Sequence, residues 1–405
     1  MSDVVARPFR PVRLTQPGLN TVMAVVSGAA LLALVVAASM QAGGTWRLGA
    51  LAVVGAGIGA VLLRTSFGFA GAFRALVQVG DRSGFQAHAV MLAVATVLML
   101  PMLAQGTLWG QAMRGDTTPM GVGFVVGALL FGAGMQVGGG CASGTLFSLG
   151  GGNGKLIGTL VGFVLGSAIG AWSMGFWWSL PSLPGVSLQG LVGFGPAVAV
   201  QLAVLAGMWV WAGRGARMPT PRLLVAGGVA LAMLNAATLV LAGKPWGETS
   251  AFALWGSKLF TAAGWDAHGW AYWQRPGFGA QLDRWTGLDV PSGMDAAILG
   301  GAVLAAALAG AFRPRWGGGG RAWAGAVLGG VAMGFGARLA NGCNIGAYFS
   351  AIAVGNVSGW AWMLLAVAGS WMGVKMRPLF GLNGPALVCA PENDHTRVPP
   401  DCASC

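Results

Sequence analysis

Charged residues are scarce in this chain of 405 residues, where Asp, Glu, Lys and Arg together make up only 8%. A soluble domain carries roughly a quarter of its residues as charged side chains. Hydrophobic residues reach 55%, and the mean hydropathy is +0.69. The composition therefore excludes a soluble protein and predicts a polytopic membrane protein.

Histidine and acidic residues are also few, with 3 His and 11 Asp plus Glu. His88, His268 and His395 are scattered without the spacing of metal ligands, which argues against haem and catalytic zinc. No acidic residue falls clearly inside the duplicated core described below, so the sequence indicates no coupling ion, and we expect no cofactor. The segment GGGNGKL at 150–156 lacks the first glycine and the Ser/Thr of a phosphate-binding loop and predicts a turn.

Basic residues outnumber acidic ones by 23 to 11, but they lie in short clusters between apolar runs. This pattern is typical of cytoplasmic loops of a membrane protein and argues against a nucleic-acid-binding surface. Arg7, Arg10 and Arg13 precede a first apolar run at 21–42 that is too long for a signal-peptide core. We interpret it as an uncleaved first span.

Ten apolar runs are long enough to cross a bilayer about 30 Å thick. They lie at 20–42, 48–63, 86–109, 119–138, 155–178, 193–213, 222–243, 293–312, 322–340 and 358–375. Four stretches, at 66–79, 141–150, 249–263 and 343–354, are too short or interrupted to span. The sequence predicts an all-α polytopic membrane protein of about ten transmembrane helices and four short re-entrant or half-helices in two inverted repeats.

One glycine-rich block with a cysteine occurs twice, 202 residues apart. Residues 123–144 read GFVVGALLFGAGMQVGGGCASG, and residues 325–346 read GAVLGGVAMGFGARLANGCNIG. Six glycines and one cysteine coincide, and Cys141 and Cys343 are the cysteines before the C-terminal tail. A duplicated hydrophobic unit of this kind predicts a paired site.

Loop charge gives an expected topology. With the N-terminus inside, Arg214, Arg222, Arg313, Arg321 and Arg377 fall on the cytoplasmic side, as the positive-inside rule requires. The uncharged loop 181–192 and the mixed loop 265–292 then fall outside. The two glycine–cysteine blocks acquire opposite orientations. We predict a cytoplasmic segment at 1–19, a first membrane repeat at 20–213, a second at 214–377 and a polar tail at 378–405.

Two half-helices that begin near the midplane would direct free N–H groups and positive dipole ends to one site, which favours a small anion. A neutral thiol there can donate a weak hydrogen bond to sulfur or oxygen. Buried cysteine is also common as a small core residue. Recurrence in both halves favours a substrate path at Cys141 and Cys343, together with Gly140, Gly144, Gly342, Gly346 and Asn344.

The stretches 127–144, 329–352 and 64–76 resemble the YeeE/YedE family of bacterial membrane proteins, and the similarity extends over about residues 45–378. Members include thiosulfate uptake transporters and proteins associated with selenium metabolism. The resemblance implies a narrow path lined by cysteines that hold thiosulfate through S–H···S contacts, in the bacterial inner membrane with both termini cytoplasmic. Cys141 and Cys343 would be two of those cysteines.

The chain departs from the thiosulfate transporters of that family at one position. Their third cysteine lies in a Phe-Cys-Phe type segment, where this chain has Phe67-Gly68-Phe69. The sequence thus favours uptake of a small sulfur-containing anion, thiosulfate first. A selenium species or another sulfur oxyanion is the alternative, supported by Gly68 and by FGARLANGCN at 335–344, which matches the selenium-associated branch.

Arg74, Lys258 and Arg338 are candidates for steering the anion by charge, or for structural roles. For Arg338 we favour anchoring of the half-helix to backbone carbonyls. Arg74 and Lys258 can equally snorkel at helix ends. Asn341 and Asn344 flank Cys343, and capping is the favoured role for both.

The tail from about residue 378 contains Cys389, Cys402 and Cys405. A single Cys-x-x-Cys pair without other ligands is a weak metal signal, and we favour a dispensable tail. The family resemblance implies a TusA-like cytosolic sulfur carrier as a partner to which sulfur could be handed. A membrane-bound sulfurtransferase using these thiols is a further alternative.

Overall fold

The computed structural model describes residues 17–40, 46–216, 219–283 and 289–382. Their long elements are all helical: α1 (Pro17–Ser39), α2 (Trp46–Thr65), α4 (Ser83–Gln105), α5 (Val122–Gly138), α7 (Leu156–Ser179), α9 (Phe194–Arg214), α10 (Arg222–Ala242), α13 (Val290–Leu308), α14 (Gly320–Leu339) and α16 (Ser358–Met376). Within the described ranges, 9 helical runs are long and apolar enough to cross a membrane, and α16 adds a helix of 19 residues. The prediction of an all-α polytopic membrane protein is confirmed.

The four short stretches form short helices close to their predicted positions. They are α3 (Phe69–Val79), α6 (Ala142–Gly150), α11 (Thr249–Ala262) and the π-helical η3 (Asn344–Ser350), which continues into α15 (Ala351–Ala353). The chain breaks before α6 at Gly139 (φ +87°) and before η3 at Gly342 (φ +149°), conformations that a side chain rarely adopts. These glycines separate each short helix from the long helix that precedes it.

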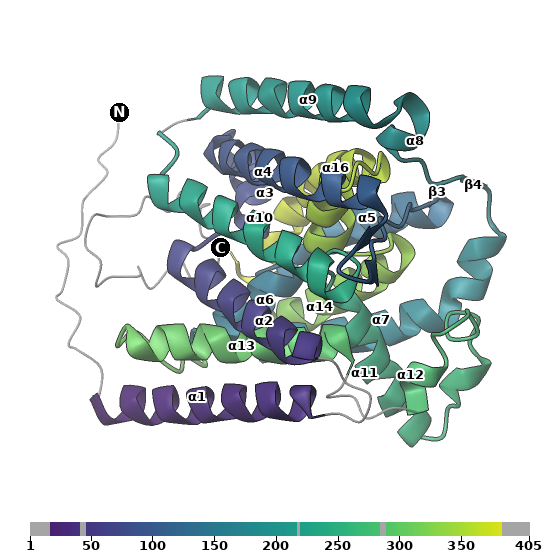
Figure 1. The fold of residues 1–405 in the computed structure, drawn as a ribbon. Helices are drawn as coiled ribbons and strands as arrows, with labels where there is room; N and C mark the ends of the chain where they lie inside the picture. The colour runs from purple at the N-terminus through teal and green to yellow at the C-terminus, as the bar shows by residue number, and fades with distance from the viewer. Residues whose placement is uncertain (1–16, 41–45, 217–218, 284–288, 383–405) are drawn as a thin grey trace.

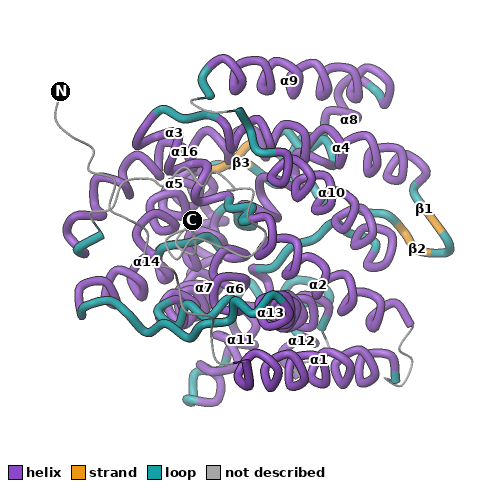
Figure 2. Tube along the Cα trace, turned by 90° about the vertical axis from the view of Figure 1, so that its left-hand side faces the viewer, coloured by secondary structure: helices purple, strands orange, loops and turns teal. Residues whose placement is uncertain are grey.

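Small elements occupy the remaining connections. They are the antiparallel pairs β1 (Thr107–Leu108) with β2 (Gln111–Ala112) and β3 (Met120–Gly121) with β4 (Ser182–Leu183), the helices α8 (Leu188–Val192) and α12 (Ala280–Asp283), and the 3₁₀ turns η1 (Ala267–Gly269) and η4 (Arg377–Phe380). Figure 2 shows β1 and β2 at the edge of the bundle. The predicted span 86–109 therefore ends early: its last residues form this hairpin, because Gly106 and Gly110 have positive φ.

The two glycine blocks lie against each other, backbone to backbone, as α5 and α14. A Cβ on Gly127 would be 2.6 Å from the carbonyl oxygen of Gly336, and a Cβ on Gly134 would be 2.7 Å from that of Gly329. Gly127 matches Gly329 in the duplicated block, and Gly134 matches Gly336, so the contacts are reciprocal. Glycine is required here because any side chain would overlap the facing backbone.

Packing between the other helices is reciprocal as well. Helix α7 packs on α14 while α16 packs on α5, and α1 packs on α13 while α9 packs on α4. Figures 1 and 2 show α1 and α9 on opposite sides of the bundle. Both carry exposed valines, including Val25 (65%) and Val204 (47%). In a membrane protein such outward-facing apolar side chains face lipid.

Candidate functional site

Cys141 is the N-cap of α6 and is buried, with 2% of its surface exposed. Its sulfur accepts a hydrogen bond from the Gly144 N–H at 3.4 Å and lies 3.5 Å from the Ser143 hydroxyl. The backbone amide of Ala70, in the first turn of α3, also bonds to this sulfur. The thiol is thereby fixed where two short helices begin.

Cys343 is the N-cap of η3 and is 1% exposed. Its sulfur accepts from the Ile345 N–H at 3.3 Å and lies 4.0 Å from the Glu248 carboxyl, at the start of α11. The chain before Glu248 is held in place by Trp246, whose N–H donates to Asn235 at 2.8 Å and whose carbonyl accepts from Ser350 at 2.8 Å. α11 and η3 thus begin side by side.

The N-termini of the short helices thus meet in pairs: α3 begins beside Cys141, the N-cap of α6, and α11 begins beside Cys343, the N-cap of η3. Each helix N-terminus carries the equivalent of about half a positive charge. Free N–H groups at such ends bind anions.

The room for a side chain beside the two thiols differs: it is tight at Gly144 and open at Gly346. A Cβ on Gly144 would meet only the Cys141 sulfur, at 3.2 Å, and a Cβ on Gly346 would meet only Gly247, at 4.0 Å. A Cβ on Gly342 would press on the following helix, with Ala347 N only 2.7 Å away, whereas a Cβ on Gly140 would make ordinary contacts at 3.4 Å. Of the predicted glycines, Gly342 shapes the turn before η3, and Gly346 has room beside it.

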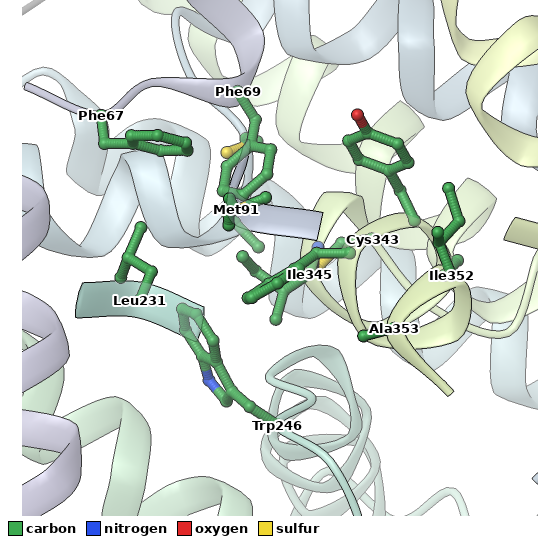
Figure 3. Close-up of a cluster of buried hydrophobic side chains, with 14 of the residues drawn as sticks. Phe67, Phe69, Met91, Leu231, Trp246, Cys343, Ile345, Ile352 and Ala353 are labelled. Atoms are coloured by element: carbon green, nitrogen blue, oxygen red, sulfur yellow. Dashed lines mark hydrogen bonds between the residues drawn. The ribbon is translucent and has the colours of Figure 1, made fainter. Parts of the chain in front are cut away.

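Aromatic side chains enclose this region. Phe67, Phe69 and Trp246 belong to the same buried cluster as both cysteines, and Figure 3 shows their rings around Ile345, next to Cys343. Apolar walls exclude water and strengthen the electrostatic contacts inside.

Arg338 is buried and anchors α14 to its neighbours. Its guanidinium donates to the Tyr272 hydroxyl at 2.5 Å and to the Thr249 hydroxyl at 2.8 Å. The partners are side-chain oxygens and not the backbone carbonyls that we expected. Arg338 fixes the first turn of α11, one residue from Glu248.

The capping role expected for Asn341 and Asn344 is wrong. The N-cap of η3 is Cys343, and Asn341 instead donates to the Thr118 hydroxyl at 3.0 Å. Asn344 is fully buried, and neither amide atom has a hydrogen-bond partner among the described residues. Its amide is available to a ligand beside Cys343.

Positive charges gather beyond the Cys141 end. Arg74 on α3 is buried, and its charge acts on Arg377. The charge of Arg377 acts in turn on Lys155. The Lys155 ammonium would lie 3.9 Å from a Cβ placed on Gly139. Sequence reasoning assigned Lys155 to a turn and missed this grouping. Lys258 lies in the last turns of α11, away from Cys343.

Three buried carboxyl groups were also missed: Asp81, which accepts hydrogen bonds from Ser83, and Glu248 and Asp295. Glu248 has 0% and Asp295 1% of its surface exposed, so the expectation of no acidic residue in the core is wrong. One signal could have found Glu248: the segment 248–258 aligns with 64–74 through a shared Thr-Ser pair, which places Glu248 where a half-helix starts.

Comparison with known proteins now adds to this geometry. The model of the family described as "Sulphur transport" matches residues 64–372, most of the chain. The chain belongs to the sulphur transport family. The matched region includes all four short helices, both cysteines and the buried carboxyls.

Three relatives are similar over different lengths. "Probable transporter YedE" of Salmonella typhimurium is 31% identical over 165 residues, and that of Escherichia coli K12 is 30% identical over 165 residues. These matches cover 40% of this chain and span only 39% of either relative. "Thiosulfate transporter TsuA" of Spirochaeta thermophila is 27% identical over 344 residues, covering 79% of this chain and 96% of that protein. The family and these names indicate transporters and not enzymes.

Cys389, Cys402 and Cys405 lie outside the described residues, so the role of the tail and a TusA-like partner stay predictions.

Proposed function

We propose that this protein takes up a small sulfur-containing anion, thiosulfate first, through the bacterial inner membrane along a path between Cys141 and Cys343. One observation carries the proposal: two buried thiols occupy matching N-cap positions at the starts of two short helices. Backbone N–H groups would hold the oxyanion end, and the S–H groups would donate to its sulfur.

The reciprocal packing of the helices supports two inverted copies around this path. Because α9 corresponds to α1 in its contacts, we place the start of the second copy at Phe194, and not after residue 213. The cations Arg74, Lys155 and Arg377 would then mark the cytoplasmic side, consistent with the positive-inside rule.

Transport of a selenium species or another sulfur oxyanion is the second candidate. Gly68, the N-cap residue of α3, supports it, since no thiol stands at the start of that helix. A path with fewer sulfurs would discriminate less sharply in favour of thiosulfate.

Uptake of labelled thiosulfate into reconstituted vesicles tests the proposal. We expect Cys141→Ala or Cys343→Ala to lower the initial rate by about 10- to 100-fold, because each removes a hydrogen bond to a charged ligand. The double variant should show no uptake above protein-free vesicles. Normal uptake by the double variant would disprove a path through the thiols.

A matched control replaces Cys389, Cys402 and Cys405 with alanine and should leave uptake unchanged. Loss of activity in that control alone would favour the membrane-bound sulfurtransferase. Unlabelled selenium compounds and sulfite, added as competitors, rank the substrates: stronger inhibition by them than by thiosulfate would favour the second candidate.

A further inference from the structure

Glu248 stands directly on the proposed path. Its carboxyl is completely buried and lies 4.0 Å from the Cys343 sulfur. The second carboxyl oxygen, Oε1, has no hydrogen-bond partner among the described residues. An ionised carboxylate without partners is very unfavourable in such an interior, so the group is stable there only when it holds a proton.

Asp295 on α13 is an independent second observation. It is 1% exposed, and neither carboxyl oxygen has a partner within the described part of the chain. The charge of Glu248 acts on it. The amide of Asn344, also buried and unpartnered, adds a group at the same end of the path. Several polar groups are thus left for a ligand that passes.

Within the described residues, Glu248 forms no salt bridge with a cation. Arg338, on the neighbouring α14, directs its terminal nitrogens to the Tyr272 and Thr249 hydroxyls. The ionisable groups that face Glu248 from other elements are Cys343, Cys141 and Asp295. α7, which packs on α11, has no charged residue, and Lys258 lies near the other end of α11.

His268 pairs with Asp266 and Asp283 on the exposed surface, so a positive charge on His268 does not compensate Glu248.

Beside Cys343, an anion and an ionised Glu248 carboxylate repel each other. Two like charges about 4 Å apart, in a medium of effective dielectric about 20, disfavour their joint presence roughly a thousandfold. The anion can therefore pass Cys343 only while Glu248 is protonated.

We propose that Glu248 carries one proton with each anion, so that uptake is a symport of the anion and H⁺. The carboxylate accepts a proton from the water on the side from which the anion arrives, forming the O–H bond. That bond breaks when the anion has left, and the proton goes to the water on the other side. This inference rests on the proposed function and gives it an energy source.

Accumulation of labelled thiosulfate in vesicles, with the membrane potential held at zero, tests the symport. With the outside one pH unit more acidic, one proton per anion drives an inside-to-outside ratio of about ten. We expect this ratio for the unmodified protein. Glu248→Gln, which mimics the neutral carboxyl, should give a ratio near one while still equilibrating thiosulfate down its gradient.

Asp295→Asn provides a second variant. Removing the neighbouring carboxyl should let Glu248 release its proton more easily, which moves the pH at half-maximal uptake down by about one unit. Asp116→Asn, which neutralises an exposed carboxyl outside the core, should behave as the unmodified protein does.

The outcomes separate the two proposals. Downhill uptake without any response to the pH gradient, or tenfold accumulation by Glu248→Gln, overturns the symport and leaves the transport function standing. Absence of downhill thiosulfate uptake by the unmodified protein overturns the proposed function and the symport with it.

Discussion

Cys141 and Cys343 occupy matching positions in the duplicated block, yet among the described residues only Cys343 has a carboxyl group, that of Glu248, within reach of its sulfur. Beyond Cys141 lie Arg74, Lys155 and Arg377. Glu248 lies 4.0 Å from the Cys343 sulfur, and its charge acts on Asp295, a second buried carboxyl of that half. The sequence block is repeated, and the charged residues around its two copies are not.

The comparison shows which features depend on the repeated glycines and which depend on single side chains. The glycines set where each short helix begins and how closely α5 and α14 approach. Individual residues then give each thiol its own surroundings: a hydroxyl at Ser143 on one side and a carboxyl at Glu248 on the other. Because the two thiols have similar backbone positions but different neighbours, we expect them to act differently on an anion that passes both.

The largest expected effect comes from adding a side chain beside either thiol. Gly144→Val places its Cβ 3.2 Å from the Cys141 sulfur, and Gly346→Val places its Cβ where the nearest neighbouring atom, in Gly247, is 4.0 Å away. We expect the initial rate of thiosulfate uptake in vesicles to fall at least about 100-fold, and the melting temperature to change by less than about 4 °C.

Gly195→Val, on the exposed surface of α9 with no atom near its Cβ, is the matched control and should leave uptake unchanged. Wild-type rates in both path variants would mean that this space lies off the path and that the two thiol sites cannot be compared as parts of one route.

An intermediate effect on uptake is expected from the cations that lie beyond Cys141. Lys155→Gln removes one charge near Gly139 and should raise the KM for thiosulfate about fivefold with little change in kcat, because the charge attracts the anion before it reaches the thiols. Kinetics in vesicles at low and high salt measure this, and the difference between variant and wild type should shrink at high salt.

Lys375→Gln is the control for that charge, since Lys375 is exposed and its ammonium lies over the Trp371 ring. We expect less than about a twofold change in KM. Equal changes in KM for Lys155→Gln and Lys375→Gln would mean that Lys155 acts only as part of the general surface charge.

The smallest effect should come from Ser143→Ala. The hydroxyl lies 3.5 Å from the Cys141 sulfur, a long contact, and its loss should lower uptake by about two- to threefold. Uptake by Ser148→Ala, a buried serine in the same helix, provides the reference. A tenfold loss confined to Ser143→Ala would instead give the hydroxyl a direct part in holding the anion.

Most of the helical framework could be predicted because apolar length and glycine breaks are local signals. The stretch 141–150 was too short to span, and it forms α6 from Ala142 to Gly150. The end of α4 was missed because Leu108 and Trp109 continue the apolar run, while the turn depends on the backbone at Gly106 and Gly110.

The site was predicted only where residue type and repetition coincide. Cys141 and Cys343 were found because both signals agree. Glu248 was missed because an acidic residue before a helix usually caps it at a surface; only the packing of α11 against α13 and η3 shows it as buried. Lys155 was missed because no local signal links it to its neighbour Arg377, which lies 222 residues later in the sequence, at position 377.

The contact between α5 and α14 also bears on how the two copies could diverge after duplication. A change at Gly329 would push its side chain to 2.3 Å from the amide nitrogen of Gly138, and one at Gly336 to 2.5 Å from the carbonyl oxygen of Gly127. A side chain at either position is tolerated only if the facing helix moves away. The close approach of α5 and α14 therefore depends on glycine in both blocks at once, so a substitution in one block cannot be compensated by a smaller residue in the other.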